Sequence, residues 1–400
     1  MWQILVDVWI VAGLAVASAT LPGTMELLFL TLGGVLPAKR RTSLAPVDRP
    51  SRIAFVVPAH NEEAAIANCV KSLHQCHPHT RTPAVFVIAD NCTDQTAALA
   101  QQAGATVLTR TDAEQRGKGY ALDFAFQTLL ARGFDYFIIV DADSSVTFNL
   151  LHEFELAFAS GAVAVQCRYK VRNAEDSMRT RWMNIALMAF NVLRPRGRDR
   201  FGASVGILGN GFGLSRSALE TVPYHAVSVV EDLEYHIRLV RAGLKVGFID
   251  AATVFGEMPS GGAGVSTQRA RWEGGRFRMI RQFVPTLARD VARGQFRLLE
   301  PMLELLLLPL GFHVLMLLAA ASTPLLAIRL YSACALAVVG LHLLCAIAMG
   351  GGGWRDVSAL LSAPFYLIWK LRIIPRLLRN ASGSAAWVRT ERQPLKGAHK

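Results

Sequence analysis

The chain has 400 residues, of which 52% are hydrophobic and only 18% are charged. Its mean hydropathy of +0.31 is too high for an ordinary soluble enzyme, and its composition is too mixed for a pure bundle of membrane helices. A soluble domain anchored in a membrane therefore fits best. The net charge of +12 is compatible with nucleic acid, anionic lipid or an anionic substrate, and it does not choose among them.

The first apolar region covers residues 8–35, which contain a single charged residue, Glu26. Because Pro22-Gly23 interrupts this region, we expect either a broken hydrophobic hairpin or one tilted span with an interfacial piece. A cleaved signal peptide is the alternative, but no basic residues precede the apolar run. The basic residues of 39–41 follow at once, so the positive-inside rule places the next domain in the cytoplasm.

Strands and helices are expected to alternate between Ile53 and about Val254. The predicted strands are 53–57, 84–88, 105–108, 137–140 and 162–169, and the predicted helices are 61–73, 93–103, 120–130, 149–159 and 231–240. Alternation at this spacing predicts an α/β domain with a largely parallel sheet. The six cysteines show no repeated Cys-x-x-Cys spacing, which argues against a zinc module or a disulfide framework and suits a reducing cytoplasm.

Two further regions combine apolar and basic residues. The stretch 178–201 mixes six arginines with Trp182 and several aliphatic residues, which predicts a helix lying on an anionic membrane surface. These arginines are Arg179, Arg181, Arg194, Arg196, Arg198 and Arg200. Nearer the C-terminus, 302–321 and 331–349 are predicted spans, and 357–378 is either a third span or an interfacial helix.

The composition divides the chain into four predicted regions. They are an N-terminal membrane segment (1–38), a cytoplasmic α/β domain with interfacial helices (39–295), C-terminal transmembrane and interfacial helices (296–380) and a basic cytoplasmic tail (381–400). The catalytic or binding chemistry is expected in the second region, because strand ends and loops of α/β domains position ligands.

Four groups of polar residues fall at strand ends or in loops of the α/β domain. They are Asp90, the pair Asp141 and Asp143, the pair Glu231 and Asp232, and Gln268 with Arg271 and Trp272. Each group alone has a plain structural explanation, such as a turn cap, acidic residues in the first turn of a helix, or an anchor at a membrane interface. Their joint presence and order favour a shared chemical role.

Asp141 and Asp143 follow the apolar run 137–140, where the end of a buried strand is expected to open into a crevice. Two carboxylates at that position suggest a bound divalent cation. A reaction that expels a nucleoside diphosphate needs such a cation, because charge develops on the leaving oxygen.

The same reaction needs a carboxylate that takes a proton from the attacking hydroxyl. Asp232, at the start of a predicted helix, is the candidate general base. Arg271 could add a fixed positive charge to the diphosphate, and Trp272 could offer a flat apolar face to a sugar ring.

The ordered motifs of the chain resemble those of family 2 glycosyltransferases. These motifs are Val56 to Glu63, Asp90, Arg116 to Gly119, Asp141-Ala142-Asp143, Gly209-Asn210-Gly211, Glu231 to Glu234, and Gln268 to Trp272. The membrane-integrated branch, with cellulose, chitin and hyaluronan synthases and bacterial exopolysaccharide synthases, is the most similar. The resemblance covers about Ile53 to Trp272, and the Gln-x-x-Arg-Trp element is its most specific part.

The resemblance implies a GT-A-like α/β fold with a mixed sheet, flanked by transmembrane and interfacial helices. It also implies inverting transfer of a sugar from a nucleotide-sugar donor, usually a UDP-sugar, with Mg²⁺ or Mn²⁺. The implied roles are nucleoside binding for Asp90, nucleotide binding for Lys118, diphosphate and metal binding for Asp141 and Asp143, substrate binding for Glu231, general base for Asp232, and the acceptor and diphosphate end for Gln268, Arg271 and Trp272.

The leading hypothesis is therefore an enzyme of the cytoplasmic (inner) membrane that extends a polysaccharide or lipid-linked glycan, with membrane lipids and export or assembly proteins as expected partners. One alternative is a single-sugar glycolipid synthase acting on ceramide, diacylglycerol or polyprenyl phosphate. Others are a transporter, which needs more spans, and a silent assembly subunit, which would not need these carboxylates. Nucleic-acid binding is not expected, because the basic residues gather near predicted membrane surfaces without a recognition motif.

Overall fold

The structure is a computed structural model. It describes residues 1–38, 51–76, 83–225, 230–258, 263–307, 309–368 and 371, and the side chains of 263–273 lie outside this description. The basic residues of 39–41 and the predicted tail 381–400 also lie outside it. The chain forms two compact units, each described by itself below.

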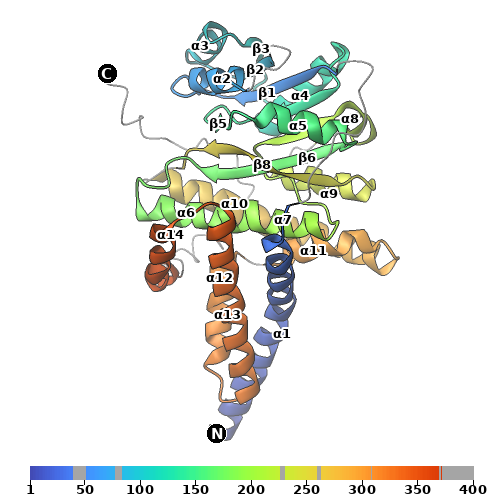
Figure 1. The fold of residues 1–400 in the computed structure, drawn as a ribbon. Helices are drawn as coiled ribbons and strands as arrows, with labels where there is room; N and C mark the ends of the chain where they lie inside the picture. The colour runs from blue at the N-terminus through green and yellow to red at the C-terminus, as the bar shows by residue number, and fades with distance from the viewer. Residues whose placement is uncertain are drawn as a thin grey trace. The chain divides into compact units, whose positions relative to one another are not determined.

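The first unit, here called the sheet unit, contains Ala38–Leu187 and Ser204–Gln268. Its strands are β1 (Ile53–Ala59), β2 (Ala84–Asp90), β3 (Thr106–Arg110), β4 (Tyr136–Ile139), β5 (Ser145–Val146), β6 (Ala164–Val171), β7 (Phe212–Ser215) and β8 (Val246–Gly256). They form one sheet in the order β3-β2-β1-β4-β7-β6-β8-β5 (Figure 1).

The sheet is mixed. The first four strands of this order are mutually parallel, as the alternating pattern predicts. β7 runs antiparallel to both β4 and β6, and β5 runs antiparallel to β8. β5, β7 and β8 are not among the predicted strands; the residues of β7 follow glycines that predict a loop. The carboxyl ends of β1, β2, β3 and β4 therefore lie at one edge of the sheet.

Helices cover both faces of the sheet. α2 (Ile66–His74), α3 (Thr96–Gln102) and α5 (Leu150–Ala159) pack on one face, and α4 (Lys118–Ala131), α8 (Arg216–Thr221) and α9 (Glu231–Arg241) pack on the other. Successive strand residues point to opposite faces, so Phe55 and Val57 join one core while Ala54 and Val56 join the other. This three-layer arrangement leaves the strand ends to carry polar residues.

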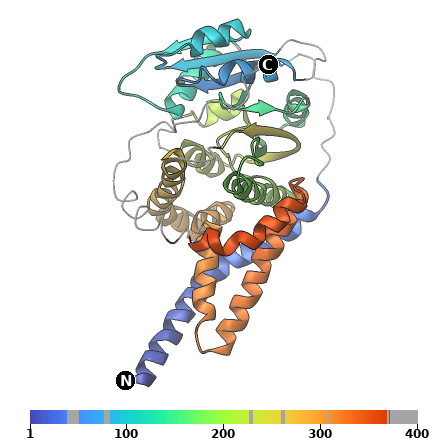
Figure 2. The same cartoon turned by 90° about the vertical axis from the view of Figure 1, so that its left-hand side faces the viewer.

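The second unit, here called the helical unit, contains Met1–Pro37, Met188–Ala203 and Arg269–Ser384. Its helices are α1 (Trp2–Val35), α7 (Arg194–Arg200), most of α10 (Ala263–Ala292), α11 (Leu299–Leu306), α12 (Leu310–Ala321), α13 (Leu326–Met349) and α14 (Trp354–Ala359). α1 lies alongside α12 and α13 (Figures 1 and 2), where Leu27, Leu317 and Ala335 share an apolar cluster.

Two helices of the described chain, α1 and α13, are long and apolar enough to cross a membrane. α1 is continuous through Pro22, so of the two predicted alternatives the broken hairpin is wrong and the single span agrees with the structure. A proline is tolerated in such a helix when neighbouring groups compensate for its missing N–H. The predicted span 302–321 is instead divided between α11 and α12, which meet at a bend and would count as a third span only if taken together.

The prediction that the arginines of 178–201 lie on a membrane surface is wrong for Arg198. Arg198 is fully buried and pairs with Glu26, Glu300 and Glu304. Arg196 donates to the carbonyl oxygens of Gly34 and Leu36 at the end of α1, at 2.7 and 2.9 Å. These arginines turn inward because carboxylates and free helix-end carbonyls face them. The helix predicted for this stretch is present, and a π-helical turn at Ala189–Leu193 joins α6 (Met178–Met188) to α7.

Candidate functional site

Asp141 and Asp143 lie just beyond β4, at the edge of the sheet where the parallel strands end. The backbone N–H of Asp141 donates to the side-chain oxygen of Asn210 at 3.0 Å. The hydroxyl of Ser144 lies 3.3 Å from a carboxylate oxygen of Asp143 and accepts from the Asn210 amide at 2.8 Å. The turn with the two carboxylates is therefore held by the loop that precedes β7.

Lys118 begins α4 and reaches the same turn. Its ammonium pairs with the Asp141 carboxylate and also donates to the carbonyl oxygen of Gly209. Burial alone would lower the pKa of Lys118, but the negative charges of Asp141, Glu231 and Asp232 outweigh it and raise that pKa. Lys118 is therefore a fixed positive charge. The side chains of Lys118 and Asp141 remain 23% and 33% exposed, so a ligand can approach the pair.

Glu231 and Asp232 occupy the first turn of α9, where acidic residues complement the helix dipole. Burial raises the pKa of Asp232, although the N–H of Leu233, which donates to its carboxylate at 2.8 Å, acts the other way. Burial and the charge of Asp232 raise the pKa of Glu231 to about 7. A carboxylate with a raised pKa is a better proton acceptor than an exposed one.

Asp232 also lies close to Gly209. A Cβ atom added to Gly209 would be 2.9 Å from a carboxylate oxygen of Asp232. Gly209 thus contacts both Lys118 through its carbonyl oxygen and Asp232 through its bare Cα. The structure brings together four of the predicted site residues, namely Lys118, Asp141, Glu231 and Asp232.

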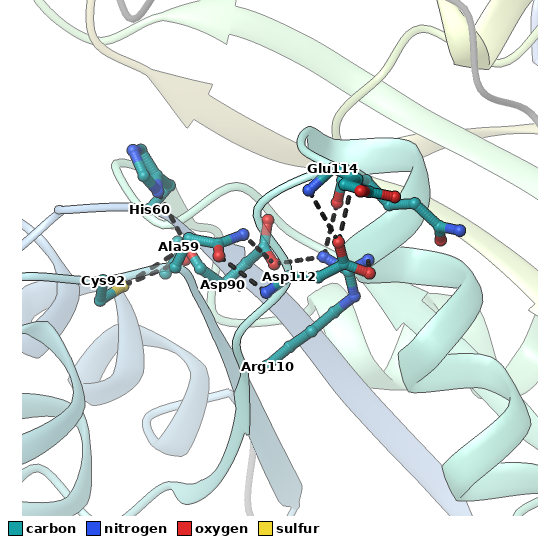
Figure 3. A network of polar contacts seen from close by, with 9 residues as sticks. Ala59, His60, Asp90, Cys92, Arg110, Asp112 and Glu114 are labelled. Atoms are coloured by element: carbon teal, nitrogen blue, oxygen red, sulfur yellow. Dashed lines mark hydrogen bonds and ion pairs between the residues drawn. The ribbon is translucent and has the colours of Figure 1, made fainter.

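Asp90 ends β2 in a separate polar network at the same edge (Figure 3). Its carboxylate pairs with Arg110 at 2.7 Å and accepts from the Asn91 amide at 3.1 Å. The ring nitrogen Nδ1 of His60 lies 2.8 Å from the Asp90 carbonyl oxygen. Arg110 in turn pairs with Asp112 at 3.2 Å. This network holds Asp90 in one orientation.

Arg110 belongs to the site but is not among the predicted site residues. It stands opposite Asp90 in the parallel register of β2 and β3, and both side chains are less than a tenth exposed. One signal in the sequence could have identified it: β2 ends in an acidic residue, Asp90, and the next strand, β3, ends in a basic one, Arg110. Figure 3 shows the two side chains pointing toward each other from neighbouring strands.

Gln268, Arg271 and Trp272 fall within the helix α10, but their side chains lie outside the described residues. The structure therefore does not test whether they join the other site residues. Their assignment to the acceptor and diphosphate end stays a prediction.

The residues at the end of β4 fit a divalent cation that a substrate helps to hold. Among the residues that the structure describes, no three His, Cys, Asp or Glu side chains gather as a complete metal site. Asp141 and Asp143 supply two carboxylates, and Mg²⁺ in particular binds one or two carboxylates together with substrate phosphates. Oxygen ligands of this type suit Mg²⁺ and Mn²⁺.

Comparisons with known proteins find relatives among glycosyltransferases. The chain is 25% identical over 242 residues to the probable glycosyltransferase YdaM of Bacillus subtilis, covering 58% of this chain and 57% of that protein. It is 30% identical over 237 residues to the beta-monoglucosyldiacylglycerol synthase of Synechocystis, covering 57% of this chain and 49% of that one. The chain thus spans about half the length of these curated relatives.

A solved structure shares the fold over nearly the whole chain. It is the mannosyltransferase PcManGT from Pyrobaculum calidifontis in complex with GDP-Man and Mn²⁺, with a TM-score of 0.56, 16% identity, and coverage of 94% of this chain and 97% of that one. This likeness confirms the predicted GT-A-like fold. The sequence model described as glycosyltransferase like family 2 matches residues 50–275, more than half of the chain. The chain therefore belongs to glycosyltransferase like family 2 and is a glycosyltransferase.

Proposed function

We propose that this glycosyltransferase transfers a sugar, with inversion and with a divalent metal, from a UDP-sugar to a polysaccharide or lipid-linked glycan. The observation that carries the proposal is the joint placement of Lys118, Asp141 and Asp232 around Gly209. One positive charge, one carboxylate at the proposed cation site and one partly buried carboxylate are the groups that such a transfer requires.

In this proposal Asp141 and Asp143 would hold Mg²⁺ or Mn²⁺, which when bound would neutralise charge on the departing diphosphate. Lys118 adds a second positive charge on the same side, since it is already paired with Asp141. Asp90, fixed by Arg110, would receive the nucleoside. These groups stabilise the leaving nucleotide without themselves changing covalently.

Asp232 would accept the proton of the acceptor hydroxyl as its oxygen attacks the anomeric carbon. Its burial raises its pKa, which strengthens it as a base. Attack from the side opposite to the leaving diphosphate inverts the configuration of that carbon. Glu231 beside it, and Gln268, Arg271 and Trp272 on α10, would bind the substrates.

In this proposal the enzyme is attached to the inner membrane and its sheet unit lies in the cytoplasm; what supports membrane attachment is the composition of two helices. α1 and α13 are long and apolar enough to span a bilayer. Large apolar side chains on them are exposed, among them Trp9 and Phe29 on α1 and Leu341 on α13, and lipid would cover them. Exposed apolar residues such as Trp354 and Phe365 follow α13 as well, as expected of either an interfacial helix or a third span.

A single-sugar transfer to a lipid is the second candidate. It is favoured by the 30% identity to a protein named beta-monoglucosyldiacylglycerol synthase. Diacylglycerol would then be the acceptor, and the enzyme would release a glycolipid instead of extending a chain.

The test is to incubate membranes that contain the protein with a panel of UDP- and GDP-sugars and to determine the size of the product. A long glycan supports the leading proposal, and one sugar on a lipid supports the second candidate. Absence of any sugar transfer, with and without Mn²⁺ and with lipid and oligosaccharide acceptors supplied, would contradict both.

A further inference from the structure

Gln166 is a polar residue in the core of the sheet unit. It lies on β6 with no exposed surface, between the buried residues Val165 and Cys167. A buried amide is costly unless its hydrogen-bonding groups are satisfied, so its partners indicate what it is there to hold.

The side chain of Gln166 holds both ends of the loop 208–211. Its amide nitrogen donates to the carbonyl oxygens of Asn210 at 2.8 Å and Gly211 at 3.0 Å, and also to that of Cys167 at 2.9 Å. Its amide oxygen accepts from the N–H of Leu208 at 2.9 Å. With two hydrogens for three acceptors, at least one hydrogen is shared, and the amide nitrogen has no donor left unused.

The loop depends on such support because its backbone is unusual. Gly209 and Gly211 have φ angles of +78° and +70°, in the left-handed region that favours glycine. A Cβ on Gly211 would be 2.6 Å from the sulfur of Cys167, so the loop also packs tightly on β6. Glycines give the backbone freedom, and Gln166 removes that freedom through hydrogen bonds.

Gly209 of this loop contacts Lys118 and the proposed general base, Asp232. Gly209 receives the Lys118 ammonium on its carbonyl oxygen, and its Cα is so near Asp232 that an added Cβ would be 2.9 Å from the carboxylate. A shift of this residue would therefore change the separation of Lys118 and Asp232.

Asn210 of the same loop contacts the turn that contains Asp141 and Asp143, the proposed diphosphate and metal site. Asn210 is 1% exposed, and its side-chain oxygen accepts from the N–H of Asp141 while its nitrogen donates to Ser144. Ser144 in turn contacts the Asp143 carboxylate at 3.3 Å. The same four-residue loop therefore touches the turn of Asp141 and Asp143 and the carboxylate of Asp232.

We infer that Gln166 is a positioning residue for sugar transfer. By fixing the loop 208–211, it sets the geometry between the Asp141 to Asp143 turn and Asp232. It contacts none of the reacting groups itself, and it acts through Asn210 and Gly209. This inference rests on the proposed function.

The test uses Gln166→Met, which keeps the volume of the side chain and removes its hydrogen bonds. Hydrogen–deuterium exchange of the solubilised full-length protein should rise in 208–211 and in 141–144. Affinity for UDP in the presence of Mn²⁺, measured by calorimetry, should fall about tenfold, as should kcat. If Gln166→Met does not fold, Asn210→Ala should show the same changes in 141–144 and in UDP affinity.

The matched control is Ser215→Ala, at the opposite end of β7. Ser215 caps α8 by accepting from the N–H of Ala218 at 3.1 Å, so its loss should lower thermal stability but leave exchange in 141–144 and UDP affinity unchanged. If the wild type binds UDP but the folded Gln166 and Asn210 variants show unchanged hydrogen exchange and unchanged UDP affinity, the inference about Gln166 is overturned and the proposed function is not. A wild type that binds neither UDP nor GDP with Mn²⁺ would overturn it together with the proposed function.

Discussion

The sheet unit and the helical unit both contain paired charged side chains, but the two sets differ in exposure and in role. At the sheet edge, Lys118 and Asp141 pair while keeping a quarter to a third of their side chains exposed. In the helical unit, Arg198 is fully buried and faces the carboxylates of Glu26, Glu300 and Glu304. A charged group left open at a strand end can meet a ligand, whereas a charge enclosed by opposite charges holds helices together.

The largest expected effect concerns the charged residues at the edge of the sheet unit. Asp232→Asn removes the group that would accept the acceptor proton, so the rate of sugar transfer should fall by about 10²–10⁴-fold. UDP binding should be nearly unchanged, because Asp141, Asp143 and Asp90 remain. Transfer assayed in membranes, beside calorimetry on the purified protein, checks both parts. Full transfer activity in the variant would remove Asp232 from the mechanism.

In the helical unit, Arg198→Met should lower the free energy of unfolding by about 3–5 kcal/mol, because it leaves the carboxylates of Glu300 and Glu304 without their partner. The control is Arg200→Met on the same helix, where the side chain is exposed and the change should be small. Thermal unfolding of the solubilised proteins compares them. Equal melting temperatures for the two variants would show that the cluster does not stabilise the fold.

Gly209→Ala tests how closely the loop and Asp232 are fitted. Gly209 has φ +78°, and its new methyl would meet the Asp232 carboxylate at 2.9 Å. Gly161→Ala is the control, since Gly161 has φ +87° and open space around the added Cβ. Both changes should cost about 1–2 kcal/mol of stability, but only Gly209→Ala should lower kcat. A similar kcat for the two variants would mean that the contact does not matter.

The smallest expected effect concerns pH. The pKa of Glu231 in the folded protein is about 7, raised from 4.5 by burial and by Asp232. Because of the raised pKa, the Glu231 carboxyl group binds its proton more tightly in the folded protein than in the unfolded chain. Protonated Glu231 therefore stabilises the folded state below about pH 4.5, and this stabilisation is lost as the pH rises through about 7. The melting temperature of Glu231→Gln should therefore rise relative to wild type across this interval, by about 2–4 °C, because the partial exposure of Glu231 reduces the effect to about 1 kcal/mol. A constant difference between the two proteins would contradict the raised pKa.

Much of the sheet unit could be predicted from the sequence, because alternating apolar runs and strand-end carboxylates are local signals. The helix expected at 231–240 and the parallel strands β1 to β4 are confirmed. Gln166 and Arg110 were not found, because their importance comes from neighbours distant in the chain, Asn210 and Asp90.

The helical unit was predicted less well. Arginines among apolar residues have the same pattern whether they face anionic lipid or buried carboxylates, and only the fold places Glu26 and Glu304 beside Arg198. Of the two alternatives predicted around Pro22, the broken hairpin is wrong, because α1 continues through this proline as one helix. The roles of the site residues and the predicted domain boundaries stay predictions.

The most direct test of the central claim, that the open edge of the sheet binds a nucleotide through a cation, is calorimetry with UDP and GDP on wild type and Asp143→Ala. We expect the wild type to bind one of these nucleotides only when Mn²⁺ or Mg²⁺ is present, and the variant to bind it at least about tenfold more weakly. Equal metal-dependent affinity in both proteins, or no binding by either, would contradict the account.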